Sequence, residues 1–536
     1  MSSQKQITKA AGVIGLSTVV SRILGFVRDA VFAWLFGARM ASDAFQVAFR
    51  IPNILRRLVG EGAMTAAFIP VFVEERQRSA EHAWAMTNAV ITLLSVLLIG
   101  ISVGGVILTP FLIRLIAPGF HAIPEKFELT VYLTRITFPY IFFISLTALT
   151  MGILNALHHF LTPALGPAML NLALIACALW LGPHLQTPIV GQSIGVILGG
   201  IAQLLFQTPA LLKHGYRYRV SFDYHNPAVR KICLLILPAF FGLAVTQITI
   251  FINTFFASLL SEGSISYLYY ADRIVEFPLG IFGIAVATAV LPTMSAQTAK
   301  GDYAQLVETL SFALRLVLFI TIPSTVGLIV LRAPIVALLF ERGEFTGRDT
   351  IATAQAVFCY AVGLAAFTGV RIIVPVFYAM KDTMTPVLCG VGGVGANIVL
   401  CGTPLGLLWF SQHFGVSLGA TLQGILTTVF WRHWWLALAT SLASYCNLLL
   451  LLWLLRRRLG PIRLGWRSIL RSLTKVLLAS LIMGVCCMPF AGPATHHPFV
   501  LGGLVLVSMV IFFGCAYFFE SEEVLFLKTL VFERKT

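Results

Sequence analysis

Residues 89–113 read AVITLLSVLLIGISVGGVILTPFLI, a run of 25 residues without a charged side chain. A helix needs about 20 predominantly apolar residues to cross a bilayer. Such runs recur along the 536 residues, of which 58% are hydrophobic and 11% are charged. A soluble domain has about 25% charged residues. The sequence therefore predicts an all-α polytopic membrane protein.

The apolar runs, separated by polar loops, predict about fourteen spans. These cover residues 10–36, 42–73, 84–115, 128–157, 162–182, 188–212, 231–260, 266–295, 306–339, 351–379, 384–408, 434–455, 469–490 and 498–520. The segment 409–433 is apolar enough for a further span, but a span there would place the basic cluster 456–475 outside. We therefore predict an external hairpin or interfacial helix at 409–433.

The net charge of +15 comes from basic residues in short loops between the spans. A soluble protein with this charge would be a candidate for nucleic-acid binding, whereas in a membrane protein the distribution of Lys and Arg sets the topology. Basic residues concentrate on one side when the N-terminus is placed inside, while the other side holds only Arg39, Lys126, Arg342, Arg348 and Arg432. We predict that both termini are cytoplasmic, that no cleavable signal peptide is present, and that no nucleic acid is bound.

The two halves of the sequence match weakly at an offset of 222–223 residues. Residues 63–70 parallel 285–292, and the Thr-Pro pair 162–163 parallels the Thr-Pro pair 385–386. Each half then contains six predicted spans, which indicates a parallel repeat of two six-helix lobes that can rock about a central site. The predicted domains are an N-terminal lobe at 1–229, a C-terminal lobe at 230–458, and two appended helices with a tail at 459–536.

Ionisable residues inside predicted spans are costly and mark function by default. The first, second and eighth spans carry Arg22, Arg28, Asp29, Asp43, Arg50, Arg56, Arg57, Glu61, Asp272, Arg273 and Glu276. Helical spacing places Asp43, Arg50 and Arg57 on one face, which Glu61 continues, and it allows Arg273 to pair with Glu276. These charges either pin helices together as mutual pairs, reach the interface, or line a polar interior.

The first two spans hold five arginines against three acidic residues, and this excess favours an anionic ligand. A guanidinium group stays charged and donates paired hydrogen bonds that fit a phosphate or diphosphate. We see no nucleotide-binding motif, no catalytic constellation and no metal-ligand spacing, since the nine cysteines all lie in apolar stretches. The sequence predicts a transporter without a cofactor or metal, and it does not predict an enzyme.

Several motifs resemble those of the MurJ (MviN) family. They are SRILGFVRD at 21–29, SDAF at 42–45, IPNILRR at 51–57, and YYADR with EFP at 269–273 and 276–278. MurJ proteins are lipid II flippases of bacterial peptidoglycan synthesis, within the multidrug/oligosaccharidyl-lipid/polysaccharide exporter superfamily. The resemblance covers nearly the whole chain, apart from the 409–433 segment, which is longer than the usual loop.

The resemblance implies fourteen helices, alternating access around a cationic cavity, and a lipid-tail groove at the last two helices. It implies substrate contacts from Arg22, Arg28, Asp43, Arg56, Arg273 and Glu276, with Arg50, Arg57, Asp29 and Asp272 as secondary candidates. The implied substrate is lipid II, an undecaprenyl-diphosphate-linked disaccharide peptide, moved between leaflets of the bacterial inner membrane. Membrane lipids and the cell-wall synthesis machinery are further expected partners.

Other functions remain open on the residues alone. A flippase for another polyprenyl-diphosphate oligosaccharide would use the same cationic chemistry. A drug exporter fits less well, because cationic drugs would meet positive charge. A membrane-embedded glycosyltransferase would need an acidic metal-binding motif, whereas a non-transporting scaffold would tolerate loss of the arginines.

Overall fold

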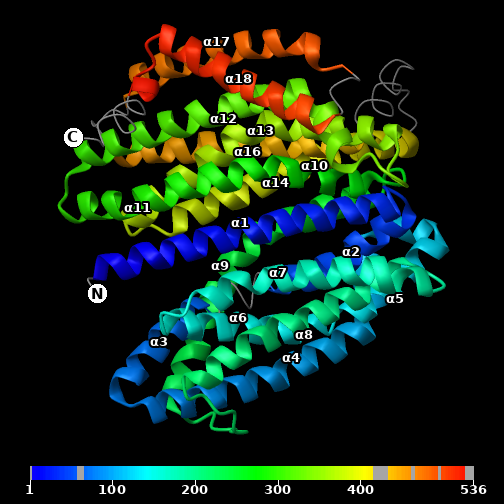
Figure 1. Ribbon diagram of the computed structural model, residues 1–536, viewed down its shortest axis with the longest axis vertical. Helices are drawn as coiled ribbons and strands as arrows, with labels where there is room; N and C mark the ends of the chain where they lie inside the picture. The colour runs from blue at the N-terminus through cyan, green and yellow to red at the C-terminus, as the bar shows by residue number, and fades with distance from the viewer. Residues whose placement is uncertain (1–2, 57–64, 415–431, 460–464, 493–496, 526–536) are drawn as a thin grey trace. The chain divides into compact units, whose positions relative to one another are not determined.

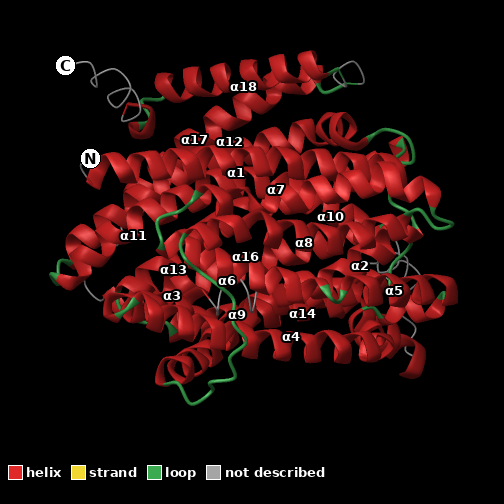
Figure 2. Cartoon of the chain, turned by 60° about the horizontal axis from the view of Figure 1, so that its bottom comes forward, coloured by secondary structure: helices red, strands yellow, loops and turns green. Residues whose placement is uncertain are grey.

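The computed structural model describes residues 3–56, 65–414, 432–459, 465–492 and 497–525. These residues form helices joined by short loops, and none of them lies in a β-strand (Figure 2). Contacts group the chain into two compact units. The first unit comprises Met1–Ser266 with Arg342–Phe345, and the second comprises Tyr267–Glu341 with Thr346–Thr536.

Nine long helices belong to the first unit (Figure 1). They are α1 (Ser3–Phe36), α2 (Met40–Leu55), α3 (Thr65–Arg78), α4 (Ala80–Ile116), α5 (Pro124–Thr137), α6 (Tyr140–Ala156), α7 (Leu161–Ala176), α8 (Ile189–Lys213) and α9 (Pro227–Ser258). Within this unit α1 packs on α7, and α2 packs on α5. These two contacts hold α1 against the largely apolar α7, and α2 against α5, which carries charged residues of its own.

The second unit contains the remaining long helices. They are α10 (Ser264–Pro278, which starts at the end of the first unit), α11 (Ile284–Ala299), α12 (Tyr303–Phe340), α13 (Gly347–Ala379), α14 (Met384–Phe414), α16 (His433–Leu459), α17 (Trp466–Cys487) and α18 (Pro498–Phe518). Helix α13 packs against both α12 and α16, and α17 packs against α12 and α18. The last two helices are therefore attached to the unit through α12.

Ten helical segments among the described residues are long and apolar enough to cross a membrane. Helices suit lipid because they satisfy their own backbone hydrogen bonds. Polar side chains cap several helix starts: the Ser79 hydroxyl accepts from the Glu81 N–H, and Thr346 and Asp349 form a capping box on α13. Apolar length and local capping thus act together to define the helices.

The ten segments coincide with ten of the predicted spans, and the structure confirms the all-α membrane fold. The four other predicted spans coincide with α1, with α2 and α3, with α9, and with α10 and α11. These four spans include the first, second and eighth, which are rich in charge. The count of fourteen crossings stays a prediction. In the ambiguous segment, α14 continues through Phe414 and α16 begins at His433, while residues 415–431 lie outside the described residues.

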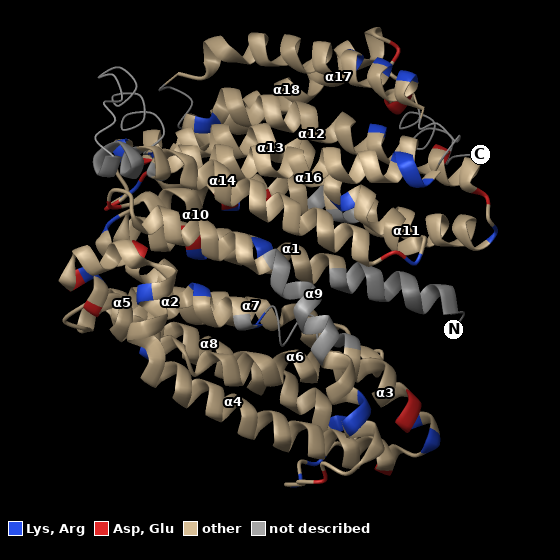
Figure 3. Ribbon diagram, turned by 180° about the vertical axis from the view of Figure 1, so that it is seen from behind, with Lys and Arg blue, Asp and Glu red and all other residues tan. Residues whose placement is uncertain are grey.

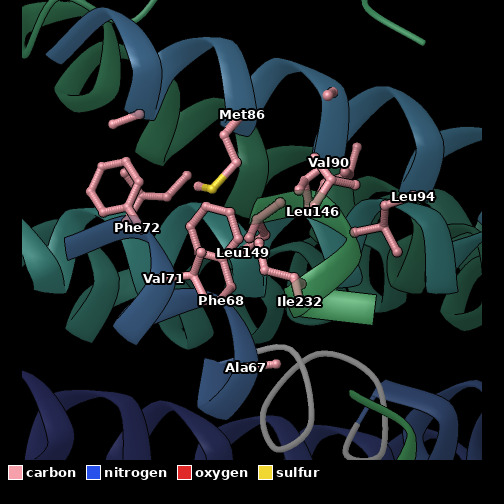
Figure 4. Close-up of a cluster of buried hydrophobic side chains, with 14 of the residues drawn as sticks. Ala67, Phe68, Val71, Phe72, Met86, Val90, Leu94, Leu146, Leu149 and Ile232 are labelled. Carbon is pink, nitrogen blue, oxygen red and sulfur yellow. The ribbon is translucent and has the colours of Figure 1, made fainter. Parts of the chain in front are cut away.

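The core of the first unit is an apolar cluster contributed by α3, α4, α6 and α9 (Figure 4). Phe68, Phe72 and Met86 are fully buried there, and Leu149 and Ile232 pack beside them. Full burial of such side chains contributes roughly 1.5–3 kcal/mol each in water, although lipid-facing helices rely more on close packing. This cluster gives the first unit a rigid frame.

Two clusters form the core of the second unit. One joins α12, α13 and α16 through residues such as Leu310, Phe377 and Leu455. The other joins α12 to α17 and α18 through Phe319 and Phe512, whose ring centroids are 5.1 Å apart. The second cluster explains why the two appended helices stay with this unit.

The turns after α6 and α13 support the internal repeat. His158 and Lys381, 223 residues apart, both adopt a φ of +59°. In both turns the N–H of the following residue reaches the carbonyl oxygen five residues back at 2.8 Å. A left-handed residue that closes a helix in this way is uncommon for a side chain other than glycine. Glu520 (φ +52°) closes α18 in the same way, with the Ser521 N–H 2.9 Å from the carbonyl oxygen of Ala516, so the shared geometry agrees with the repeat but does not by itself establish it.

Candidate functional site

Arg28 on α1 is held by two partners inside the first unit. Its Nε and Nη2 donate to Oδ1 of Asp29 at 2.9 and 2.6 Å, and its Nη1 donates to Oδ1 of Asn171 at 3.1 Å. The side chain of Asp29 is 2% exposed and that of Arg28 is 15% exposed. Burial and multiple hydrogen bonds therefore fix the direction of this guanidinium group.

Asn171 on α7 was not predicted as a site residue. Its amide nitrogen donates to the backbone oxygen of Ser21 at 3.2 Å, while its amide oxygen accepts from Arg28. The residue is buried. The available signal was a single amide side chain inside an otherwise apolar run, and such a group needs a hydrogen-bonding partner in a low-dielectric environment.

Asp43 on α2 has several protein donors around its carboxylate. Lys126 Nζ lies 2.8 Å from Oδ2, which also accepts from the Gly263 N–H at 2.9 Å. Oδ1 accepts from the N–H and the hydroxyl of Ser266 at 3.0 and 2.7 Å. The Asp43 side chain is 1% exposed. This geometry ties α2, α5 and the start of α10 together within the first unit.

Lys126 differs from the sequence expectation, which placed it in an external loop. It lies in the first turn of α5, its side chain is only 5% exposed, and its ammonium group sits 4.2 Å from the centroid of the Phe120 ring. A charged lysine is buried only when it is paired, and Asp43 provides the pair. Loop charge counts could not reveal this partner, because it is 83 residues away in the chain.

The other basic candidates of the first unit are less buried. Arg22 is half-buried and forms no ion pair with a residue that the structure describes. Arg50 donates from Nη1 to the hydroxyl of Thr254, and Arg56 donates from Nε to Oδ1 of Asn53 at 2.9 Å. Arg57 and Glu61 lie outside the described residues. Of the predicted common face, the structure therefore describes only Asp43 and Arg50.

In the second unit, Arg273 and Glu276 on α10 form the predicted ion pair, with 3.2 Å between Nη1 and Oε2. Their side chains are 32% and 43% exposed, and the neighbouring Asp272 is exposed. Arg371 on α13 also interacts electrostatically with Glu276. Arg371 was missed by the sequence reasoning, although it is an arginine inside a predicted span, which is the signal used for the other candidates.

Figure 3 marks basic and acidic residues on helices of both units, and the arginines described above are among them. Arginine donates in a planar fork that matches phosphate oxygens, and it keeps its charge in a low-dielectric site. Among the described residues, no three His, Cys, Asp or Glu side chains gather in a way that could hold a metal ion.

A comparison of the chain with known protein families identifies its family. Residues 32–510 match the profile of the family described as "Lipid II flippase MurJ".

The chain belongs to the MurJ family.

Among its relatives, a protein of Vibrio cholerae named "Probable lipid II flippase MurJ" is 38% identical, and the match covers 79% of this chain and 81% of the relative. A protein of Rickettsia prowazekii with the same name is 34% identical, over 94% of this chain and 96% of the relative. The MurJ resemblance predicted from the motifs is confirmed.

Solved structures agree with this assignment. A structure entitled "Lipid II flippase MurJ, inward closed conformation" is similar to this chain with a TM-score of 0.75 and 29% identity, over 97% of this chain and 99% of that one. A multidrug resistance transporter of the MATE family, described as a member of the MOP superfamily, gives a TM-score of 0.66 at 17% identity and covers 83% of this chain. The second likeness shows the shared fold alone. This MurJ-family chain is a multi-pass membrane protein of a transporter fold.

Proposed function

We propose that the protein moves lipid II from the inner to the outer leaflet of the bacterial inner membrane by alternating access. The observation that carries this proposal is the Arg28 arrangement in a MurJ-family chain. Arg28 is fixed by Asp29 and Asn171. Relatives of the protein are named as lipid II flippases or probable lipid II flippases. A pre-positioned guanidinium inside the membrane is suited to a diphosphate that must leave water.

In this proposal, Arg22, Arg28, Arg56 and Arg273 contact the diphosphate during the transport cycle. Arg50, Arg57 and Arg371 add positive charge, while Glu276 holds Arg273 until the substrate arrives. Asp29, Asp43 and Asp272 are assigned supporting roles, since Asp29 and Asp43 are buried against protein donors. The predicted lobes at 1–229 and 230–458, with the appended helices from 459, are the parts that would move.

We also place both termini in the cytoplasm, following the bias of Lys and Arg in the loops. The protein carries out transport without chemical conversion of its substrate and without a cofactor. Lipid II is its main partner, and the surrounding membrane lipids and the cell-wall synthesis machinery are its further partners.

Cells that depend on a plasmid copy of this protein test the proposal. After depletion of the wild-type copy, a variant with Arg28→Ala and Arg273→Ala should let lipid II accumulate in the inner leaflet and should cause lysis. An Arg76→Ala variant, which changes an arginine near the end of α3, is the matched control and should sustain growth. Normal growth and normal lipid II distribution with both arginines removed would contradict the proposal.

The same cells separate lipid II from other lipid-linked oligosaccharides. Accumulation of a different polyprenyl-diphosphate oligosaccharide, with lipid II normally distributed, would assign that compound as the substrate. The arginine chemistry is common to both substrates, so this result would change the cargo and leave the anion-binding role in place.

A further inference from the structure

An extended segment between α8 and α9, residues 216–224, lies along the first turns of α4. We call it the strap. The Asn88 amide donates to the carbonyl oxygen of Arg217 and accepts from the N–H of Arg219, both at 3.3 Å. One turn further along α4, the Thr92 hydroxyl accepts from the N–H of Ser221 at 3.2 Å. One edge of the strap backbone is thus bonded to a polar stripe on α4.

The stripe explains two polar residues in an apolar helix. Asn88 and Thr92 are spaced i, i+4 on α4 and are 7% and 3% exposed. They follow Ala80, the first residue of α4, by eight and twelve positions, which is about 12–18 Å at 1.5 Å per residue. Buried polar groups need hydrogen-bond partners. The strap backbone provides them, so the strap runs beside the membrane helix and does not extend away from it.

The side chains on alternate positions of the strap are large and exposed. Tyr218, Val220, Phe222 and Tyr224 are 50%, 67%, 60% and 64% exposed. The intervening Arg217 and Arg219 are exposed as well, so the strap presents both basic and large apolar side chains. Aromatic residues of this kind are enriched at the boundary between bilayer and water. The exposed side chains of the strap therefore have the composition of an interfacial surface.

The strap and the residues on either side of it form a basic stretch. Residues 213–231 contain Lys213, Arg217, Arg219, Arg230 and Lys231 against the single acidic residue Asp223. Of these, Lys231 is paired with Glu74 at 2.7 Å, whereas Arg217 and Arg219 are exposed on the strap itself. Basic clusters beside membrane helices attract anionic headgroups. Charge and aromatic content point to the same partner.

We propose that the strap is a binding surface for anionic phospholipid headgroups, with Arg217 and Arg219 contacting the phosphate and Phe222 entering the headgroup layer, while the Tyr218 hydroxyl stays 3.2 Å from the Thr92 hydroxyl on α4. In the orientation proposed above, this is the cytoplasmic leaflet. The binding is separate from lipid II transport, and it depends on the position of the strap on α4.

The test measures lipid binding to the purified full-length protein, without lipid II. Phosphatidylglycerol or phosphatidylcholine is titrated into the detergent-solubilised protein, and bound lipid is counted by native mass spectrometry. Arg217→Gln with Arg219→Gln should weaken binding of phosphatidylglycerol at least threefold and should leave phosphatidylcholine unchanged. The matched control is Arg456→Gln with Arg457→Gln, which removes the same charge from the exposed end of α16.

A second variant tests the placement of the strap and keeps its charge. Asn88→Leu with Thr92→Val removes the side-chain bonds that hold the strap on α4, and it should also weaken phosphatidylglycerol binding. The thermal unfolding midpoint of each variant shows whether the protein remains folded. Unchanged phosphatidylglycerol binding in the Arg217 and Arg219 variant, or an equal loss in the α16 control, would overturn the proposal. Neither result bears on lipid II transport, which is scored separately in cells.

Discussion

Arg28 in the first unit and Arg273 in the second are both paired with a carboxylate, but the two pairs differ in burial. Arg28 has Asp29 and Asn171 as partners, and the Asp29 side chain is 2% exposed. Arg273 has Glu276 at 3.2 Å, and the two side chains are 32% and 43% exposed. The first arginine is held in a buried network, whereas the second is in a half-exposed pair.

The difference separates a fixed anion-binding group from an exchangeable one. A buried charge pair is costly to break, because the remaining partner stays charged and unpaired. An exposed i, i+3 pair contributes little stability and can open at small cost. We infer that Arg28 is pre-positioned for the diphosphate, while Arg273 moves from Glu276 to the substrate. The following variants break or sharpen this comparison, in order of decreasing effect.

Arg28→Ala should have the largest effect. It leaves Asp29 buried without its guanidinium partner, which is expected to cost about 3–5 kcal/mol of folding free energy, and it should abolish transport. Chemical unfolding of the purified variant and a lipid II accumulation assay in cells measure the two effects. The double variant Arg28→Ala with Asp29→Asn should recover much of the stability and none of the transport. Recovery of transport would show that Arg28 serves the fold alone.

Arg273→Ala should reduce transport strongly with little change in stability. Its pair with Glu276 is half-exposed, so the loss of folding free energy should stay below about 1 kcal/mol. Comparison of unfolding curves and lipid II accumulation with those of Arg28→Ala gives the contrast directly. A stability loss as large as that of Arg28→Ala would remove the distinction between a fixed and an exchangeable arginine.

Asn171→Leu should have an intermediate effect on transport. The variant keeps the Arg28–Asp29 pair and removes one hydrogen bond to a charged group, worth about 1.5–3 kcal/mol. Lipid II binding to the purified protein should weaken by roughly tenfold, since 1.4 kcal/mol corresponds to a factor of ten. The variant Asn171→Gln tests whether an amide is sufficient. Equal binding by wild type and Asn171→Leu would assign Asn171 a purely structural role.

The smallest effect concerns the turns after α6 and α13. They share a backbone conformation, but their side chains make different contacts. In the first unit His159 faces His214, with ring centroids 5.8 Å apart, and burial together with His214 and Lys213 lowers the pKa of His159 below its usual 6.5. In the second unit, Asp382 accepts from Thr385 and pairs with Arg458. Burial alone would raise the pKa of Asp382, but these contacts lower it below its usual 3.8.

The two shifts predict that stability is lost in different ranges of acid pH. The unfolded chain takes up a proton at His159 more readily than the folded chain, so the contribution of His159 to stability is lost as pH falls below about 6.5. The contribution of Asp382 persists until pH falls through its lowered pKa, below 3.8. Hydrogen exchange at pH 7.5 and 5.5, corrected for the intrinsic rate, should show faster opening at residues 157–161 and no change at 380–384. His159→Gln should remove the difference.

Much of the fold could be predicted from the sequence, because apolar length decides which segments become membrane helices. The pairing of Arg273 with Glu276 was also predictable, since both lie on one helix at i, i+3. The partners of Arg28 and Asp43 were not, because Asn171 and Lys126 are 143 and 83 residues away in sequence. Helical periodicity gives the face of a side chain but does not identify the neighbouring helix.

Arg371 was missed for a different reason. Its predicted span is apolar apart from this one charge, and the span contains no acidic residue with which Arg371 could pair along the helix. In the structure, Arg371 on α13 is influenced electrostatically by Glu276 on α10. A single charged or polar side chain in an apolar run, such as Arg371 or Asn171, is therefore as useful for locating a site as a cluster of charges.

The most direct measurement of the central claim is the affinity of the purified protein for lipid II and for a matched polyprenyl lipid that lacks the diphosphate. Wild type should prefer lipid II by a wide margin, and a variant with Arg28→Gln and Arg273→Gln should bind both lipids equally weakly. If the variant keeps the full preference for lipid II, the diphosphate is not recognised by these arginines, and the proposed role of the site is contradicted.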